Sequence, residues 1–357
     1  MKAFGFFLIF SFSTIHLAAC TGVQILAEDQ TKVNGRTVEF GMPLDMSVAV
    51  VPRKFAFVGQ TPLGKGLTYN SKYAATGIYC FEDAVLMDGI NEKGLVAAAF
   101  YFPGYASYTT VTKENQKKAL SPIDFPNWIL TQFATVEEVK EALSSVIIAP
   151  TVLKSWGTAP PPMHYIVYDL SGKSIVIEPL GEKLVVYENK LGVITNSPNF
   201  DWHITNLANY INLTPFNVPS LQLENLKLDS FGQGSGMLGL PGDFTPPSRF
   251  IRAALFSAAA LPPKNSLEAV AQTFHILNQF DIPLGAVREK LQGKLSFDYT
   301  LLTSVKNQQT KEYFYKSYAN QTIQFIDLSK FDLNAKSIKK MQIKGEQEMH
   351  DVSSALK

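Results

Sequence analysis

The residue of this chain best suited to chemistry is Cys20, which directly follows an apolar leader. The leader has Lys2 near its start, then a run rich in Phe, Leu and Ile, and it ends in Leu17-Ala18-Ala19. Small residues before the cut are typical of a signal-peptidase site, so cleavage after Ala19 would make Cys20 the first residue of the mature protein. A terminal cysteine carries a thiol and a free α-amine, whose reference pKa of about 7.7–8.0 lets it act as a base. Nucleophile and base would then come from one residue.

The same cysteine fits a second processing route. Leu17-Ala18-Ala19-Cys20 also matches a bacterial lipoprotein signal, in which lipid is attached to the sulfur and the amine is acylated. That modification would remove nucleophile and base together, so one Cys20 cannot be both anchor and catalyst. A third interpretation, an incidental cysteine in an uncleaved leader, also stays open on the leader alone.

Two charged residues follow in a β-rich run. Arg36 lies sixteen positions after Cys20, and Glu39 lies three further on. If two short strands pair, the Arg36 guanidinium would lie beside the thiol and favour the thiolate. Glu39 could hold the terminal amine by a charge-assisted hydrogen bond. Taken alone, an arginine and a glutamate at this spacing are more often surface residues.

Asn196 and Arg249 are two further candidates. Asn196 directly follows a predicted strand, where a fixed carboxamide can donate a hydrogen bond to an oxyanion. The alternative for Asn196 is an ordinary turn residue before Ser-Pro. Arg249 follows Thr245-Pro246-Pro247-Ser248 at a predicted helix start, where the helix dipole does not favour a cation. That conflict suggests an ion pair within a site.

Other motifs are set aside. Gly234-Ser235-Gly236-Met237-Leu238-Gly239 matches GxGxxG, but Leu240-Pro241-Gly242 follows it and cannot open the helix that a dinucleotide site requires. A shaped loop is expected there. His203 has no serine in a nucleophile elbow to pair with and is interpreted as structural. None of the five histidines pairs with another at metal-ligand spacing, so no metal site is expected.

The composition is that of an ordinary globular protein. The 357 residues, or 338 without the nineteen of the leader, suffice for one large core. The apolar content of 46% and net charge of +1 give no reason to invoke nucleic acid or an anionic surface. The leader is short and polar for a membrane span. With Cys20 and Cys80 as the two cysteines, a disulfide framework is not expected, and Cys80 is interpreted as a small buried hydrophobe.

The elements that must position these residues are mostly strands. Strands are predicted at 38–40, 47–51, 55–58, 84–87, 95–97, 165–168, 174–177, 184–187, 313–315 and 323–325, with a turn over 88–94. Helices are predicted at 135–144, 248–260 and 265–280, the first and last opened by the capping pairs Thr135/Glu138 and Asn265/Glu268. Strands, then helices, then strands again indicate a layered α+β domain. A solvated, partly ordered tail is expected from Lys330 onward.

Taken together, several segments resemble the choloylglycine hydrolase family, which contains bile salt hydrolases and penicillin V acylases. The resemblance runs from Cys20 to about Asp327, and its pieces are specific jointly rather than singly. They are Gly35-Arg36-Thr37, Asn91-Glu92-Lys93-Gly94-Leu95, Phe102-Pro103-Gly104-Tyr105, Thr195-Asn196-Ser197-Pro198 with Phe200-Asp201-Trp202, and Leu240-Pro241-Gly242-Asp243-Phe244-Thr245-Pro246-Pro247-Ser248-Arg249. The resemblance implies an N-terminal nucleophile hydrolase with a four-layer αββα sandwich. It divides the chain into a signal peptide at 1–19, the hydrolase domain at 20–329 and a C-terminal extension of unknown role at 330–357.

The resemblance also implies a role for each candidate. Cys20 is the nucleophile with its own amine as general base, and Arg36 is the arginine beside the thiol. Asn196 supplies the oxyanion-hole side chain, the Tyr101 backbone amide completes that hole, and Arg249 supports the site. At the position of Tyr101, bile salt hydrolases often have asparagine and penicillin V acylases often have tyrosine. Tyr101 therefore favours the acylases. The family usually has aspartate where this chain has Glu39, which keeps the charge on a side chain one methylene longer.

The implied reaction is hydrolysis of a linear amide through an acyl-thioester, with no metal or organic cofactor. Phe102 and Tyr105 would suit an apolar acyl group on a small-molecule substrate. The expected enzyme is exported, to the periplasm or beyond the cell, and the resemblance implies a possible homotetramer. Two alternatives stay open: a lipid-anchored, non-catalytic binding protein of the outer membrane with the same fold, and an acylase that acts on acyl-homoserine lactones.

Overall fold

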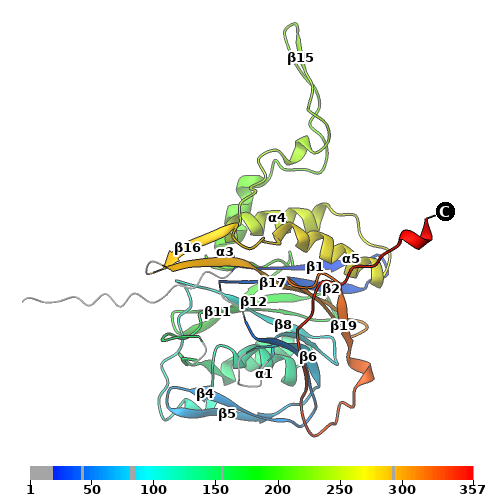
Figure 1. Ribbon diagram of the computed structural model, residues 1–357. Coiled ribbons are helices and arrows are strands. Elements are labelled where there is room, and N and C mark those ends of the chain that lie inside the picture. The colour runs from blue at the N-terminus through cyan, green and yellow to red at the C-terminus, as the bar shows by residue number, and fades with distance from the viewer. Residues whose placement is uncertain (1–18, 42–43, 81–85, 154–155, 292–293, 357) are drawn as a thin grey trace, which may run out of the picture.

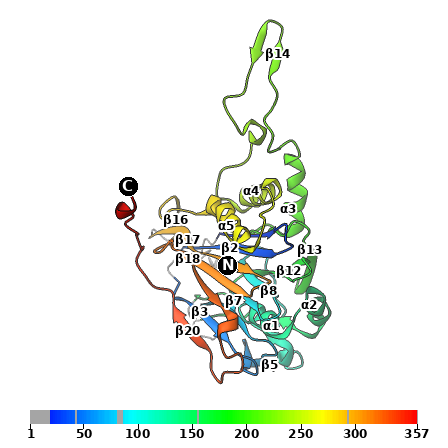
Figure 2. The same ribbon diagram turned by 90° about the vertical axis from the view of Figure 1, so that its right-hand side faces the viewer.

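The computed structural model of the chain describes residues 19–41, 44–80, 86–153, 156–291 and 294–356 (Figure 1). The expected leader lies outside the described residues apart from Ala19, and so do Ala84 and Val85 of one predicted strand. Two stacked antiparallel sheets form the centre of the molecule, and helices cover their outer faces (Figures 1 and 2).

The first sheet carries Cys20 at the start of its edge strand. Within the described residues its order is β1-β2-β17-β18-β19, and β16 also pairs with β17. Its strands are β1 (Cys20–Leu26), β2 (Lys32–Phe40), β16 (Val287–Leu291), β17 (Lys294–Asn307), β18 (Glu312–Ser317) and β19 (Gln324–Asp327). Because β17 pairs with β2, a strand from the C-terminal third of the chain lies beside the strand that bears Arg36.

The second sheet lies across the core from the first. Its order in the described residues is β13-β12-β11-β8-β7-β6-β3-β20. Its strands are β3 (Met46–Val51), β6 (Ala75–Cys80), β7 (Leu86–Asn91), β8 (Val96–Tyr101), β11 (Met163–Tyr168), β12 (Ser174–Leu180), β13 (Lys183–Glu188) and β20 (Lys339–Gln342). The predicted meander of three strands is confirmed as β11, β12 and β13. Part of the tail beyond Lys330 joins this sheet, because β20 pairs with β3.

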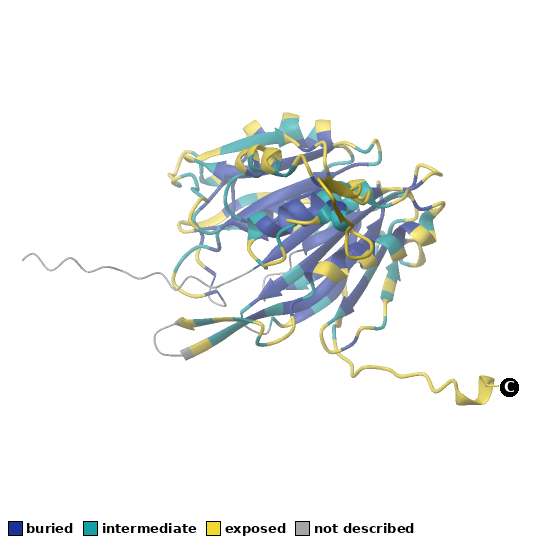
Figure 3. Cartoon of the chain, turned by 90° about the horizontal axis from the view of Figure 1, so that it is seen from above, coloured by how far each residue is buried: buried dark blue, intermediate teal, exposed yellow. Residues whose placement is uncertain are grey.

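Helices complete the outer layers. They are α1 (Asp124–Gln132), α2 (Val136–Ala142), α3 (Phe200–Leu207), α4 (Pro246–Ala259) and α5 (Ser266–Leu277). Helices α4 and α5 pack on the first sheet, and α1 packs on β7 and β8 of the second. The buried residues lie mainly in the strands between these layers (Figure 3). This arrangement confirms the predicted αββα sandwich.

Short elements fill the connections. They are β4 (Ala56–Thr61), β5 (Gly64–Asn70), β9 (Ala119–Leu120), β10 (Ile147–Ile148), β14 (Leu221–Leu223), β15 (Leu226–Leu228) and the 3-10 turns η1 (Gln116–Lys118), η2 (Leu143–Ser145), η3 (Ala208–Tyr210), η4 (Ser235–Met237), η5 (Asn278–Phe280), η6 (Leu328–Lys330) and η7 (Ser353–Ala355). The hairpin β14–β15 projects far from the sandwich (Figures 1 and 2). No helix in the described part of the chain is both long and apolar enough to cross a membrane.

Local sequence signals explain several boundaries. The Thr135 hydroxyl accepts from the Glu138 amide at 3.2 Å, and the Asn265 side chain accepts from the Glu268 amide at 3.1 Å, so both predicted helix caps are confirmed. The predicted turn over 88–94 is wrong at its start, because β7 continues to Asn91. The Asn91 side chain accepts from the amides of Lys93 and Leu95, which places the tight turn after it.

Candidate active site

Cys20 and Arg36 meet through the antiparallel pairing of β1 and β2. Cys20 lies opposite Val38 in this ladder, and Gly22 lies opposite Arg36. The Arg36 Nη2 atom lies 2.9 Å from the Cys20 Sγ atom. The sixteen-residue spacing thus corresponds to a hairpin, and the contact that the spacing suggested is present.

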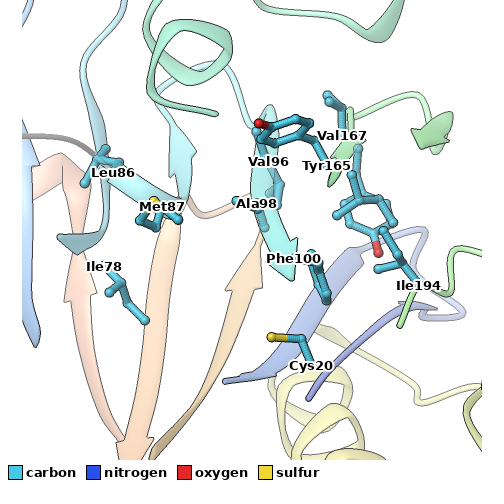
Figure 4. Packing of buried hydrophobic residues seen from close by; sticks show 14 of the residues in the cluster. Cys20, Ile78, Leu86, Met87, Val96, Ala98, Phe100, Tyr165, Val167 and Ile194 are labelled. Atoms are coloured by element: carbon cyan, nitrogen blue, oxygen red, sulfur yellow. The ribbon is translucent and has the colours of Figure 1, made fainter. Parts of the chain in front are cut away.

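Gly22 lets a third segment approach Cys20. It exchanges backbone hydrogen bonds with Ile194 at 2.8 and 3.1 Å. A Cβ atom at Gly22 would lie 2.8 Å from a methyl group of Ile194 and 2.9 Å from the Phe100 ring, so a larger residue would force the segments apart. Figure 4 shows Cys20, Phe100 and Ile194 together at the end of the hydrophobic core. This close approach brings Asn196, two residues further on, to the start of β1.

The Asn196 carboxamide is held at both ends. Its Oδ1 atom accepts from the Cys20 backbone nitrogen at 2.8 Å and from Arg249 Nη2 at 2.6 Å. Its Nδ2 group donates to the Tyr101 carbonyl at 2.7 Å. Asn196 is therefore no simple turn residue, because one buried side chain links β1, the end of β8 and the start of α4.

Arg249 is completely buried in the first turn of α4. It donates from Nη1 to the Cys20 carbonyl and, at 2.8 Å, to the Thr21 hydroxyl, and from Nε to the Phe244 carbonyl at 2.8 Å. Burial lowers the pKa of this guanidinium, and the negative charge of Glu39 opposes that shift. The unfavourable position in the helix dipole is thus offset by acceptors from four residues, Asn196 included.

Arg36 lies in a largely apolar setting. Besides the sulfur contact, Nη1 donates to the Ala99 carbonyl at 2.6 Å and Nε donates to the Thr37 carbonyl at 3.2 Å. The guanidinium also lies 4.2 Å from the centre of the Phe100 ring. Burial raises the pKa of the Cys20 thiol, and the Arg36 cation acts against that rise. Arg36 therefore favours the thiolate in a place where water cannot.

Glu39 is also buried and lies on β2, three residues after Arg36. Its Oε1 atom accepts from the Thr300 hydroxyl at 3.1 Å, and its Oε2 atom has no hydrogen-bond partner among the described residues. Burial raises the pKa of this carboxyl to about 8, a shift that Arg249 opposes. The Cys20 nitrogen is bound by Asn196 here, while the Glu39 backbone amide donates to the Ala19 carbonyl at 2.9 Å.

The junction between Ala19 and Cys20 is itself part of the fold. Ala19 is 7% exposed and Cys20 is 4% exposed. The carbonyl on one side of this peptide bond and the nitrogen on the other both take part in hydrogen bonds with the domain. In the folded chain the bond is therefore shielded from another enzyme.

A mostly apolar cavity lies beside the thiol. Cys20, Arg36, Glu39, Asp88 and Tyr101 contribute to its wall together with Val38, Phe40, Leu44, Met46, Ile78, Cys80, Met87, Ala99, Trp156 and Met163. Phe102 and Tyr105, which were expected to suit the acyl group, are not among these lining residues. Phe102 instead stacks on His164 at 4.3 Å, and Tyr105 is 44% exposed. Cys80 is free and buried, as predicted.

The histidines have supporting positions. His203 Nε2 lies 3.0 Å from the Asn196 carbonyl, and its ring stacks on Phe250. Burial lowers the pKa of His203 to about 4, so the ring is neutral near pH 7. These contacts agree with a structural role for His203. Its ring also holds the backbone of Asn196 in place. The described residues contain no group of three or more His, Cys, Asp or Glu side chains that could hold a metal.

Sequence reasoning missed two hydroxyls at this site. Thr21 accepts from Arg249, and Thr300 donates to Glu39. Thr21 directly follows Cys20, so a strand that begins at Cys20 is enough to predict that Thr21 lies next to the site. Thr300 lies on β17, a strand that the sequence analysis did not predict.

Comparisons with known proteins agree with this architecture. Residues 20–341 match the family described as linear amide C–N hydrolases, choloylglycine hydrolase family. The chain is 38% identical over 323 residues to a bile salt hydrolase/transferase of Clostridium perfringens, which covers 90% of this chain and 95% of that protein. It is 25% identical over 323 residues to a penicillin V acylase of Pectobacterium atrosepticum, which covers 84% of this chain and 78% of that protein.

A solved structure shows the same fold. The crystal structure of a variant of conjugated bile acid hydrolase from Clostridium perfringens has a TM-score of 0.83 with this chain at 35% identity, covering 94% of this chain and all of that one. The chain therefore belongs to the choloylglycine hydrolase family and is a hydrolase of carbon–nitrogen bonds in linear amides.

Proposed function

We propose that this enzyme hydrolyses an amide with an apolar acyl group through a thioester on Cys20. The observation that carries the proposal is the 2.9 Å contact between Arg36 and the Cys20 sulfur at the wall of an apolar cavity. A cation at this distance favours the nucleophilic form of the thiol, and the cavity suits the acyl group. The remaining residues then have roles that follow from their contacts.

The reaction begins once Cys20 is the first residue and its nitrogen is an amine. The amine accepts the thiol proton, and the sulfur attacks the amide carbonyl carbon. The amine then passes this proton to the leaving nitrogen, the carbon–nitrogen bond breaks, and an acyl-thioester remains. A water molecule, deprotonated by the same amine, attacks the thioester and releases the acid and the thiol. Glu39, with one carboxyl oxygen unpartnered among the described residues, is suited to hold the amine, because a protonated amine beside it would lower the raised pKa of this carboxyl and favour the carboxylate.

The oxyanion is stabilised by two donors fixed before the substrate arrives. Asn196 Nδ2 has a second hydrogen besides the one directed at the Tyr101 carbonyl. In an extended strand the N–H and C=O of one residue point to the same side, so the Tyr101 amide is directed towards Asn196 as well. Arg249 fixes the opposite end of the carboxamide. Donors held in this way stabilise a developing charge without having to reorganise.

The proposed substrate is a conjugated bile salt or a similar amide. The support is the 38% identity with a bile salt hydrolase/transferase, against 25% with a penicillin V acylase. Tyr101 instead favours penicillin V, whose acyl group is phenoxyacetyl, because penicillin V acylases often have tyrosine at this position. We expect kcat/KM for a glycine-conjugated bile acid to exceed that for penicillin V by about tenfold or more, because one lost apolar contact already changes discrimination by about that factor. A reversed order, or turnover of an acyl-homoserine lactone alone, would overturn this choice of substrate.

We infer that the enzyme is exported to the periplasm after removal of residues 1–19, and that residues 20–329 form the catalytic domain before an extension at 330–357. The leader pattern and the small residues before Cys20 support this. Because the Ala19–Cys20 bond is buried in the folded chain, cleavage has to come before β1 closes against β2. Retention of the native protein in the detergent phase, lost in Cys20→Ala, would instead indicate a lipoprotein.

The hairpin β14–β15 supports a homotetramer as the working form. Its leucines, Leu221, Leu223, Leu226 and Leu228, are 43–58% exposed, and an isolated hairpin is marginally stable in water. A second copy of the chain would cover them. Light scattering is expected to give four times the mass of one chain, and Leu223→Asp with Leu226→Asp is expected to reduce it. A monomeric wild type would contradict this assembly.

A further inference from the structure

A buried cluster of charged side chains lies between the two sheets, close to Arg36. Asp88 comes from β7 of one sheet, and Lys306 comes from β17 of the other. Their Oδ1 and Nζ atoms are 2.6 Å apart, and both side chains are about 2% exposed or less. Asp88 Oδ2 also accepts from the Ser304 hydroxyl at 2.6 Å and from the Tyr313 hydroxyl at 2.9 Å. The reaction outlined above uses none of these groups.

The cluster connects directly to the site. Ser304, which donates to Asp88, lies opposite Arg36 in the β2–β17 ladder, so the two side chains are on the same face of the sheet. Asp88 lines the same cavity as Cys20 and Arg36. The pKa of Arg36 is raised, because the negative charges of Cys20 and Asp88 in particular outweigh the lowering effect of burial. Among the described residues, the Arg36 guanidinium donates to two carbonyls and to the Cys20 sulfur, so Asp88 acts on it through space.

The charge of Asp88 would by itself be a disadvantage. An unbalanced carboxylate near Cys20 disfavours the thiolate, because like charges repel across a medium of low dielectric constant. Lys306, which is not among the residues that line the cavity, balances that carboxylate and also donates to Ser304 at 2.8 Å. Stability alone does not explain such a pair, because a buried ion pair is often no more stabilising than apolar residues of similar volume.

We propose that Asp88 and Lys306 are positioning residues for the reaction: Asp88 stabilises the buried Arg36 cation through space, and Lys306 neutralises Asp88 so that its carboxylate does not oppose the Cys20 thiolate. The proposal rests on the function proposed above, with Cys20 as nucleophile. The other titratable groups that face this cluster are Tyr313, Tyr168 and Cys80, and those that face Cys20 are Glu39 and Arg249.

The test is the pH dependence of Cys20 alkylation by iodoacetamide, read by mass spectrometry of the Cys20 peptide, together with kcat/KM. The protein is purified from cells that express the full chain. Lys306→Met is expected to move the alkylation midpoint upward by about one pH unit, because Asp88 is then unbalanced. The double variant Asp88→Asn with Lys306→Met removes both charges, and its midpoint is expected to return towards that of the wild type.

Two further variants keep the test decisive. Tyr313→Phe removes one donor to Asp88 with a loss of one oxygen atom, so it is expected to fold and to shift the midpoint in the same direction by a smaller amount. Lys316→Met is the matched control, because this buried lysine of β18 binds Asn278 and Gln321 instead, and its midpoint should equal that of the wild type.

The outcomes separate the two proposals. Unchanged midpoints in folded Lys306→Met and Tyr313→Phe, or equal shifts in the single and double Lys306 variants, would overturn the positioning role. In either case the wild type would still lose activity when Cys20 is alkylated. If alkylation of Cys20 leaves wild-type hydrolysis intact, the proposed function itself fails.

Discussion

Cys20→Ala is expected to abolish amide hydrolysis, with kcat/KM lower by about 10⁴-fold or more, as for other enzymes that lose their nucleophile. The physical reason is that Cys20 supplies the sulfur that forms the thioester, so its loss removes the covalent route altogether. Cys20→Ser should leave a trace of activity at most, because Arg36 at 2.9 Å is placed to favour a thiolate and an alcohol ionises far less readily. The measurement is steady-state turnover of a conjugated bile acid.

Two controls make this result interpretable. Both variants should bind the substrate and keep the circular dichroism spectrum of the wild type, since Cys20 is a small residue at a strand end. Turnover by Cys20→Ala close to that of the wild type would contradict the mechanism. A wild type without activity on any tested amide, together with lipid on Cys20, would support the anchored binding protein instead.

Asn196→Ala is expected to lower kcat by about 10²–10³-fold with a smaller change in KM, because one oxyanion donor is lost. The contacts of Asn196 explain why the loss falls on the chemical step. The same carboxamide that offers Nδ2 to the oxyanion also binds the Cys20 nitrogen and Arg249 through Oδ1.

A matched asparagine tests whether this effect is specific. Asn189 is also buried and directly follows β13, whereas Asn196 lies just after an isolated bridge from Ile194 to β1, and the Asn189 Nδ2 group donates to the Val193 carbonyl. Asn189→Ala should therefore keep kcat within a few-fold of the wild type even if it unfolds at a lower temperature. Equal losses of kcat in Asn189→Ala and Asn196→Ala would show that packing, rather than an oxyanion donor, is being measured.

The predictions that the structure confirms rest on short-range signals. The helix caps at Thr135 and Asn265 and the meander over β11, β12 and β13 each depend on residues a few positions apart. The contact between Cys20 and Arg36 is also a short-range feature, because it results from a hairpin of two strands that are neighbours in the sequence. Local rules of capping and alternation suffice for such features.

The features that were not predicted depend on partners far along the chain. Strand β17 carries Asp298, Ser304 and Lys306 at buried positions, so its sequence lacks the alternation that marks a half-buried strand. Asp88-Gly89 has the form of a turn, yet both residues lie inside β7, because Lys306 from the other sheet balances Asp88. The double role of the Asn196 carboxamide likewise requires β1, β8 and α4 to be in place.

The most direct test of the central claim is the mass of the N-terminal peptide of the native protein, taken before and during turnover of a slow amide substrate. We predict a peptide that begins with an unmodified Cys20 and that gains the mass of the acyl group, less one hydrogen, while substrate is present. The added group should be released by hydroxylamine, as expected of a thioester. A peptide that retains Ala19, carries diacylglycerol on Cys20, or acquires no acyl group during demonstrated turnover would contradict an N-terminal cysteine nucleophile in this chain.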